Sequence, residues 1–367
     1  MEHDGKGGLG LLVHQVRGGE LDREGFLRAA KEAGVTEERA AILADESLAA
    51  CESQLFPNSS GKRSNERGAM PGGTGMAETT SPGPRIHGAL MMPFANVRHL
   101  SYAEQLEATR LAGFGQLSMH PHQARAELER RTAEEMLEMA ADAGVEITRL
   151  DPLSNWNPLW LPTNMDVQYV RDFDIPASQF FEICEALRIR YASLNATFAA
   201  GVYTHDEVVE HFAAAARRGA ESGVILDMEN IPMWGVRTVR DAWSIVADSG
   251  DANAGIVFDT LHYVRGGSTP EMLREVPGER IHVVQLNDGP LSLPPGVTLE
   301  TNCFARDWPG EGEFPLVELL RILAEKDALR QVNPEVFSST NDGRSPAEIA
   351  RLSRESLLRT LADAGIA

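Results

Sequence analysis

Four short segments in the second half of the chain decide its fold: VILDMEN at 224–230, GIVFDTLH at 255–262, IHVVQLND at 281–288 and QVNPEVFS at 331–338. Each contains an apolar, β-branched run that leads to an acid or an amide, and helix-like segments separate the runs. Parallel strands joined by helical crossovers point the same way, so their carboxyl ends meet at one face. Four oxygen-bearing side chains should therefore converge there: Glu229, Asp259, Gln285 and Glu335.

Strand-like and helix-like segments alternate from residue 85 onward. The apolar runs lie at 86–92, 115–119, 145–150, 191–195, 223–229, 254–259, 280–285 and 331–336. The helix-like stretches lie near 101–112, 123–143, 176–188, 205–222, 236–249, 269–275, 315–327 and 345–365. This alternation predicts an α/β fold, a closed (β/α)8 TIM barrel. The alternative is an open doubly wound sheet, which usually has a glycine-rich loop after its first strand; MMPFANVRHL at 91–100 has none.

The chain before the predicted barrel divides into two parts by composition. Residues 1–56 contain apolar positions at helical spacing and predict a small helical N-terminal segment. Residues 57–84 are rich in Gly, Pro, Ser and Thr, with little to bury, and predict a flexible linker. A lid or a partner-binding arm is the alternative for this stretch. The barrel is expected over 85–367.

Composition excludes several classes of function. The formal net charge of −20 argues against binding to nucleic acid, because phosphate contacts need a basic surface. No apolar run is long enough to span a membrane, and the first residues lack the pattern of a secretory signal. The cysteines, Cys51, Cys184 and Cys303, are isolated and do not form a disulfide framework or a zinc–thiolate site. These features predict a cytoplasmic protein.

The four strand-end residues have the chemistry of a divalent-cation site. Carboxylates gathered in a half-buried space repel one another unless a cation compensates them. Carboxylate and amide oxygens suit Mn²⁺, Mg²⁺ or Co²⁺, with Zn²⁺ a further option although it more often takes histidine or thiolate ligands. His282, three residues before Gln285, is an alternative ligand. Strand alternation would place the two on opposite faces, and Gln285, nearer the carboxyl end, is the predicted ligand.

Other polar residues near the strand ends are candidates for substrate contacts. His262 follows Asp259 by three residues, where it would lie above the cation and donate a hydrogen bond or move a proton. His120, His122 and Asp151 end the second and third predicted strands, so they are predicted to contact substrate.

Two connections, at 151–176 and 287–315, are too long for plain barrel loops and are typical of binding loops. Trp156 and Trp160 in the first would wall a pocket or pack the loop onto the barrel. Arg306 in the second would hold a substrate hydroxyl, carboxylate or phosphate, or else pair with a neighbouring acid on the surface.

Five motifs in order resemble those of the sugar phosphate isomerase/epimerase family of xylose isomerase-like TIM barrels: LDMENIPMWGVR at 226–237, FDTLHYVRGG at 258–267, VVQLNDGP at 283–290, RDWPGEGE at 306–313 and PEVFS at 334–338. The resemblance implies a divalent metal, most often Mn²⁺, with Glu229, Asp259, Gln285 and Glu335 as its ligands. It also implies catalytic roles for Glu229, Glu335 and His262. Many members have histidine where this chain has Gln285, and dehydroshikimate dehydratase-like members have glutamine.

Two departures from the family pattern bear on the reaction. Ketose 3-epimerases of this superfamily have a further acid after the glutamate of the fifth strand, and 230–237 has none. Their substrate arginine, soon after the ligand of the seventh strand, is also absent, since LSLPPG occupies 291–296. These differences move the prediction from a plain 3-epimerase toward a broader isomerase or lyase.

Three functions are left as alternatives. The first is a metal-dependent isomerase or epimerase that acts on a sugar, keto-sugar or polyol through an enediolate. The second is a metal-dependent dehydratase or lyase, either dehydroshikimate dehydratase-like or 3-keto-glycoside-cleaving. The third is a noncatalytic barrel subunit of a complex. The expected partner is a small carbohydrate-like molecule, and a homo-oligomer or a partner subunit is left open.

Overall fold

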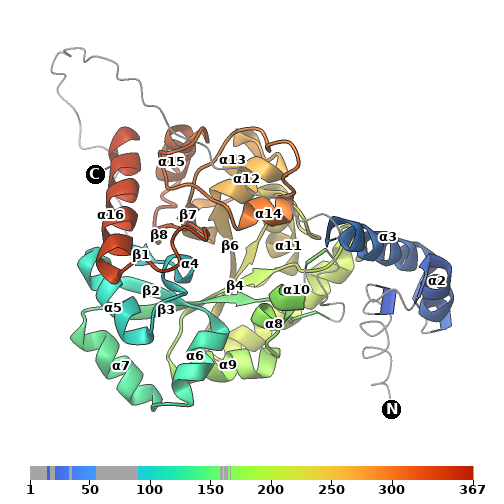
Figure 1. Ribbon diagram of the computed structural model, residues 1–367, viewed down its shortest axis with the longest axis horizontal. Coiled ribbons are helices and arrows are strands. Elements are labelled where there is room, and N and C mark those ends of the chain that lie inside the picture. The colour runs from blue at the N-terminus through green and yellow to red at the C-terminus, as the bar shows by residue number, and fades with distance from the viewer. Residues whose placement is uncertain are drawn as a thin grey trace, which may run out of the picture.

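The computed structural model describes residues 15–16, 21–32, 35–54, 90–157, 160, 164–165 and 167–366. Eight parallel strands form one sheet in sequential order, and a parallel bridge between Leu90 and Val332 joins its two edges. The strands are β1 Met91–Met92, β2 Gln116–Met119, β3 Glu146–Leu153, β4 Tyr191–Asn195, β5 Ile225–Glu229, β6 Ala254–Asp259, β7 Ile281–Leu286 and β8 Val332–Pro334. The predicted (β/α)8 barrel is confirmed (Figure 1).

Helices between the strands surround the barrel, as Figure 1 shows. The longer ones are α5 Tyr102–Leu111, α6 Pro121–Leu128, α7 Ala133–Asp142, α9 Ala177–Ala186, α10 His205–Glu221, α11 Val239–Ser249, α15 Leu316–Glu325 and α16 Pro346–Asp363. Shorter ones lie mostly in the connections: α4 Phe94–Val97, α8 Val167–Phe173, α12 Thr260–Gly266, α13 Pro270–Glu275, the 3₁₀ turn η1 Gly278–Arg280 and α14 Leu299–Cys303.

The single helix expected over 123–143 is wrong, because this stretch forms the two helices α6 and α7. Thr132 caps the start of α7: its hydroxyl accepts from the backbone N–H of Glu135, and the Glu135 carboxylate accepts from the N–H of Thr132. This reciprocal cap satisfies two helix-end donors and fixes a new helix start within the expected one.

Strand side chains fill the barrel interior in layers. Met91, Val257 and Val283 form a small apolar cluster. A buried polar group also lies inside: Arg149 donates to Asp227 at 2.7 Å, and the other oxygen of Asp227 lies 2.5 Å from Nδ1 of His282. We call these three residues the lower cluster, because they precede the strand-end residues along their strands.

The expectation that His282 and Gln285 lie on opposite faces is wrong, since both contact residues inside the barrel. The pairing of β6 with β7 shifts register, so that Ile256 pairs with Ile281 but Val257 pairs with Val283. His282 is thus an extra residue in the ladder, and such a bulge re-aims a side chain. Gly255 gives the ring its space, because a Cβ there would lie 2.4 Å from Nδ1 of His282.

Two helices of the predicted N-terminal segment, α2 Arg23–Glu32 and α3 Glu37–Gln54, pack against the barrel (blue in Figure 1). Phe26 and Leu43 share an apolar cluster with Ala199 and Val202, which follow β4. The predicted linker, 57–84, lies outside the described residues. None of the helices in the described ranges has the length and hydropathy needed to cross a bilayer.

Candidate active site

The four strand-end residues predicted from the sequence come together at the carboxyl ends of β5 to β8. Glu229, Asp259, Gln285 and Glu335 are all buried. The amide of Gln285 donates to Glu335 at 2.7 Å. Adjacent parallel strands in register explain the convergence, because Asp259 pairs directly with Gln285 in the ladder. Together with Asp151 and Arg306, described below, these residues form what we call the upper cluster.

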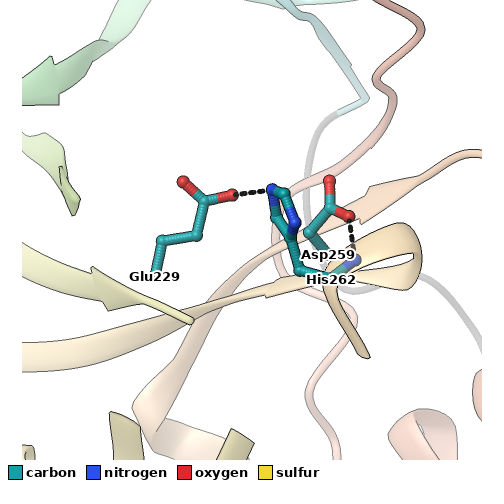
Figure 2. Close-up of side chains that lie close together, drawn as sticks. All are labelled: Glu229, Asp259 and His262. Atoms are coloured by element: carbon teal, nitrogen blue, oxygen red, sulfur yellow. Dashed lines mark hydrogen bonds and ion pairs between the residues drawn. The ribbon is translucent and has the colours of Figure 1, made fainter. Parts of the chain in front are cut away.

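His262 lies beside the upper cluster, at the start of α12. Asp259 caps this helix, since its Oδ1 accepts the backbone N–H of His262 at 3.0 Å (Figure 2). The imidazole then faces Glu229, with 3.6 Å between Nε2 and Oε1 (Figure 2). Ligand atoms of Glu229, Asp259 and His262 all lie within 4.8 Å of one another, close enough to share one metal ion. Burial lowers the pKa of His262 to about 4, so the ring is neutral at pH 7.

Arg306 is buried in the cluster, so the surface pairing considered from the sequence is wrong. Its Nη1 donates to Asp259 at 2.8 Å and to Glu335 at 2.7 Å. Antiparallel bridges place it there: Asp307 pairs with Asp288, and Ala305 pairs with Ser338. These bridges fold the long connection after β7 back across the strand ends, which brings Arg306 into the site.

The upper cluster holds more negative than positive charge. Four buried carboxylates, Asp151, Glu229, Asp259 and Glu335, face one guanidinium, Arg306. Burial raises the pKa of Asp151 to about 6 and that of Glu335 to about 8, and it raises the pKa of Glu229 well above its ordinary value. For Asp259, burial also acts to raise the pKa, but Arg306 and His262 hold it below its ordinary value. A divalent cation would relieve this repulsion.

The residues present fit such a cation. Oε1 of Gln285 is buried without a hydrogen-bond partner, so an amide oxygen is available beside the carboxylates. Nδ1 of His262 also lacks a partner. Buried polar atoms normally find one, and an unmet group of this kind points to an absent ligand, ion or water. The set of carboxylate and amide oxygens is that of a hard-cation site.

A pocket opens above the cluster and encloses about 390 Å³ of space between atoms, open solvent included. Its polar side chains come from Asp151, Asn195, Glu229, His262, Arg306 and Glu335. Aromatic rings line the rest: Phe94, Tyr169, Phe173, Trp234, Phe304 and Phe337. We call these six rings the aromatic wall.

The residues predicted to bind substrate divide into two groups. Asp151 and Arg306 line the pocket. His120 lies behind it, with its ring 5.2 Å from that of Phe94, and His122 stacks on His120 at 5.7 Å. Trp156 packs against the main hydrophobic core, and its indole N–H donates to the carbonyl of Asn195 at 2.9 Å. The three residues of this second group are absent from the pocket lining.

Sequence reasoning missed Asn195 and the aromatic wall. Asn195 closes the run YASLN at 191–195, which is the same strand-end signal that identified the other polar residues. The rings carried no such signal. Tyr169 and Phe304 come from the two long connections, and Trp234 comes from the segment after β5. Nothing in the local sequence separates these aromatics from core residues.

Known proteins resemble this chain both in sequence and in fold. The sequence profile described as the xylose isomerase-like TIM barrel matches residues 106–360. The chain belongs to this family. The fold is also that of the solved IolI protein with a binding zinc atom, which is 20% identical with a TM-score of 0.63; the match covers 75% of this chain and 99% of that one.

Curated relatives within the family are enzymes. A 3-dehydroshikimate dehydratase of Pseudomonas aeruginosa is 32% identical over 130 residues, which is 35% of this chain and 20% of that protein. An inosose isomerase of Bacillus velezensis is 26% identical over 187 residues, which is 49% of this chain and 65% of that protein. The chain thus spans a small part of the dehydratase and somewhat less than two thirds of the isomerase.

Proposed function

We propose that the chain is a divalent-metal-dependent enzyme that removes a proton beside the carbonyl of a keto-sugar or a polyol ketone, and so isomerises or epimerises it. One observation carries this proposal: buried carboxylates and an amide oxygen without a hydrogen-bond partner converge below a pocket lined by polar and aromatic side chains. Collecting four carboxylates around one guanidinium is costly to a fold, so a functional role explains them better than packing does.

The metal would be held by Glu229, Asp259, Gln285 and Glu335. The ion, when bound, would polarise the substrate carbonyl and favour the enediolate. The oxygen-only ligand set suits Mn²⁺, Mg²⁺ or Co²⁺. The zinc of the IolI structure supports a divalent ion in a barrel of this fold, and it keeps Zn²⁺ among the candidates.

Glu229 and Glu335 would transfer the proton, because they are the proposed metal ligands that line the pocket. The other two, Asp259 and Gln285, lie beneath it. Glu229 and Glu335 belong to β5 and β8, so one can take a proton from one side of a bound substrate while the other returns it. His262 stays neutral at pH 7 and would orient Glu229, which lies 3.6 Å away. Arg306, whose Nη1 donates to Asp259 and Glu335, would hold these two acids in place.

A dehydratase or lyase is the second candidate, favoured by the similarity to 3-dehydroshikimate dehydratases. Both outcomes begin with the same proton abstraction. Reprotonation of the resulting carbanion gives isomerisation or epimerisation, whereas loss of a β-hydroxyl or a β-linked glycosyl group gives dehydration or cleavage. The choice depends on the substrate that the pocket accepts.

The test combines metal content with solvent exchange. Protein loaded with Mn²⁺, Mg²⁺, Co²⁺ or Zn²⁺ and then washed should retain one ion per chain. In D₂O, it should incorporate deuterium next to the carbonyl of a keto-sugar or keto-cyclitol. Glu229→Gln should abolish both, whereas Glu355→Gln, an exposed acid of α16 that pairs with Arg351, should change neither. Protein that retains no metal and catalyses no exchange would support the noncatalytic alternative instead.

A further inference from the structure

The charges around the pocket restrict what can bind there. Among the described residues that line the pocket, Arg306 is the one lysine or arginine. Its donors already face acceptors of the protein: Nε donates to the carbonyl of Cys303, and Nη1 donates to Asp259 and Glu335. Nη2 lies 3.5 Å from Nε2 of His262. No positive group of the lining is left to hold a phosphate or a carboxylate.

A bound divalent ion does not reverse this balance. When the ion keeps them ionised, the carboxylates of Asp151, Glu229, Asp259 and Glu335 carry four negative charges, against the single positive charge of Arg306. Two further positive charges from the ion leave one negative charge in the upper cluster. An anionic ligand would be repelled at short range in a poorly solvated space, where charges interact more strongly than in water.

The aromatic wall gives the pocket its second restriction. The rings form a continuous series, with centroid distances of 5.4 Å from Phe94 to Phe337, 5.5 Å from Phe337 to Phe304 and 6.1 Å from Phe304 to Tyr169. Tyr169 in turn contacts Phe173 at 4.3 Å and Trp234 at 5.6 Å. The pocket therefore has an apolar side of flat rings and a polar side of oxygen ligands.

We propose that the substrate is an uncharged cyclic polyol ketone, a ring with hydroxyls and one carbonyl but no phosphate or carboxylate. Such a molecule has C–H groups on its ring face, which fit the aromatic wall, and oxygens at its edge, which fit the upper cluster. An open-chain sugar phosphate has neither the flat face nor the neutral charge. This inference rests on the proposed function, because it names the substrate of the same site.

A matched pair of ligands tests the charge requirement. The carboxylate of 3-dehydroshikimate and its carboxamide have the same ring and nearly the same size, but they differ by one charge. Binding can be followed by the fluorescence of Trp234, which lines the pocket, with Trp234→Phe to identify the signal. In metal-loaded protein at pH 7.5 we expect the carboxamide to bind at least about tenfold more tightly, since one unit of repulsion at close range exceeds about 1.4 kcal/mol.

One variant and a second pair of ligands test the same charge requirement. Asp151→Asn removes one of the four carboxylates without a change of shape and should narrow the preference for the carboxamide. A neutral keto-cyclitol should bind better than an open-chain ketose phosphate. Equal or tighter binding of the carboxylate overturns the inference. Because this readout is binding, it stays distinct from failure of the proposed function, which would appear as absent metal retention and absent deuterium exchange.

A second inference concerns α2 and α3, which contact the loop that follows β4. The apolar cluster around Phe26 includes Val202 of that loop, and Arg39 of α3 makes an ion pair with Glu207 at the start of α10. The guanidinium of Arg39 also lies over the ring of Tyr203, 5.5 Å from its centroid. Residues of both α2 and α3 thus contact this loop and the start of α10.

The same loop contacts Gly235, which neighbours the pocket residue Trp234. Phe198 packs edge-on against Tyr203 at 4.9 Å. It also fills the space beside Gly235, where a Cβ would lie 2.0 Å from its ring. The N–H of Gly235 donates to the carbonyl of Ala196 at 3.3 Å. Gly235 follows Trp234 of the aromatic wall, so the contacts run from the N-terminal helices to the pocket.

The geometry points to a positioning role for α2 and α3, which we call the brace: they hold the loop that follows β4, and this loop in turn positions Gly235 and Trp234 at the pocket. In the full chain, Phe26→Ala with Arg39→Ala should speed hydrogen exchange at the amides of Val202 and Gly235. It should also raise KM several-fold with little change in kcat. Arg23→Ala, which breaks the exposed pair with Asp45 between α2 and α3, is the control and should alter neither. Faster exchange within α2 with unchanged exchange at Gly235 would refute the brace.

Discussion

The barrel contains two clusters of buried charge that differ in their balance. In the lower cluster, one carboxylate, Asp227, lies between Arg149 and His282. In the upper cluster, four carboxylates share the single guanidinium of Arg306. Both are almost entirely buried. They also lie on the same strands, since Arg149 and Asp151 belong to β3 and Asp227 and Glu229 to β5.

Burial of charge therefore does not by itself identify a functional site. The lower cluster pairs opposite charges inside a closed structure, as a fold-stabilising group does. An unpartnered atom does not distinguish the clusters either, because Nε of Arg149 lacks a partner, as Oε1 of Gln285 does. What separates them is the unbalanced negative charge at the pocket, which only a bound cation or protonation can relieve.

The largest effect should come from the upper cluster. Glu335→Gln keeps the side-chain shape but removes a predicted ligand and a proton carrier. We expect loss of bound metal and a fall in turnover of roughly 10²–10⁴-fold, the range for removal of a general acid or base. Metal analysis and turnover measure this, and circular dichroism should show an intact barrel. Unchanged metal content would remove Glu335 from the ligand set.

The matched change in the lower cluster should affect stability instead. Asp227→Asn leaves Arg149 buried without its ion pair, which typically costs about 3–5 kcal/mol. Chemical denaturation should show this loss in the free energy of unfolding, while metal content at low temperature stays at the wild-type level. Loss of metal with unchanged stability would mean that the two clusters do not have separate roles.

The sequence was sufficient for the features that depend on strand periodicity. Glu229, Asp259, Gln285 and Glu335 were found because each ends an apolar run, and parallel strands bring such ends together. The barrel followed from the same alternation. The helix boundary at Thr132 was missed, although its capping-box spacing to Glu135 is visible in the sequence.

Features set by long-range geometry were not readable. Alternation alone placed His282 on the wrong face, because the bulge depends on how β6 and β7 pair. The position of Arg306 depends on bridges to Asp288 and Ser338, which lie 19 and 33 residues from their partners Asp307 and Ala305. Separate segments that meet only in the folded barrel also form the aromatic wall. No local pattern specifies such contacts.

The smallest effect is a dependence of stability on pH that metal should remove. In the metal-free protein, burial raises the pKa of Glu335 from 4.5 to about 8. Between these values the folded protein keeps a proton that the unfolded chain releases, so the free energy of unfolding falls as pH rises. Each such group contributes up to about 1.4 kcal/mol per pH unit.

The window from pH 6.5 to 8 isolates this contribution. Burial lowers the pKa of His262 from 6.5 to about 4, so the neutral ring stabilises the fold increasingly as pH rises, but only up to about 6.5. Above that value the buried acids dominate, and denaturation in EDTA should show stability that falls toward pH 8. Saturating Mn²⁺ keeps the carboxylates ionised in the folded state, and the slope should largely disappear. Equal slopes with and without metal would show that the ion does not neutralise these acids and would contradict the proposed ligand set.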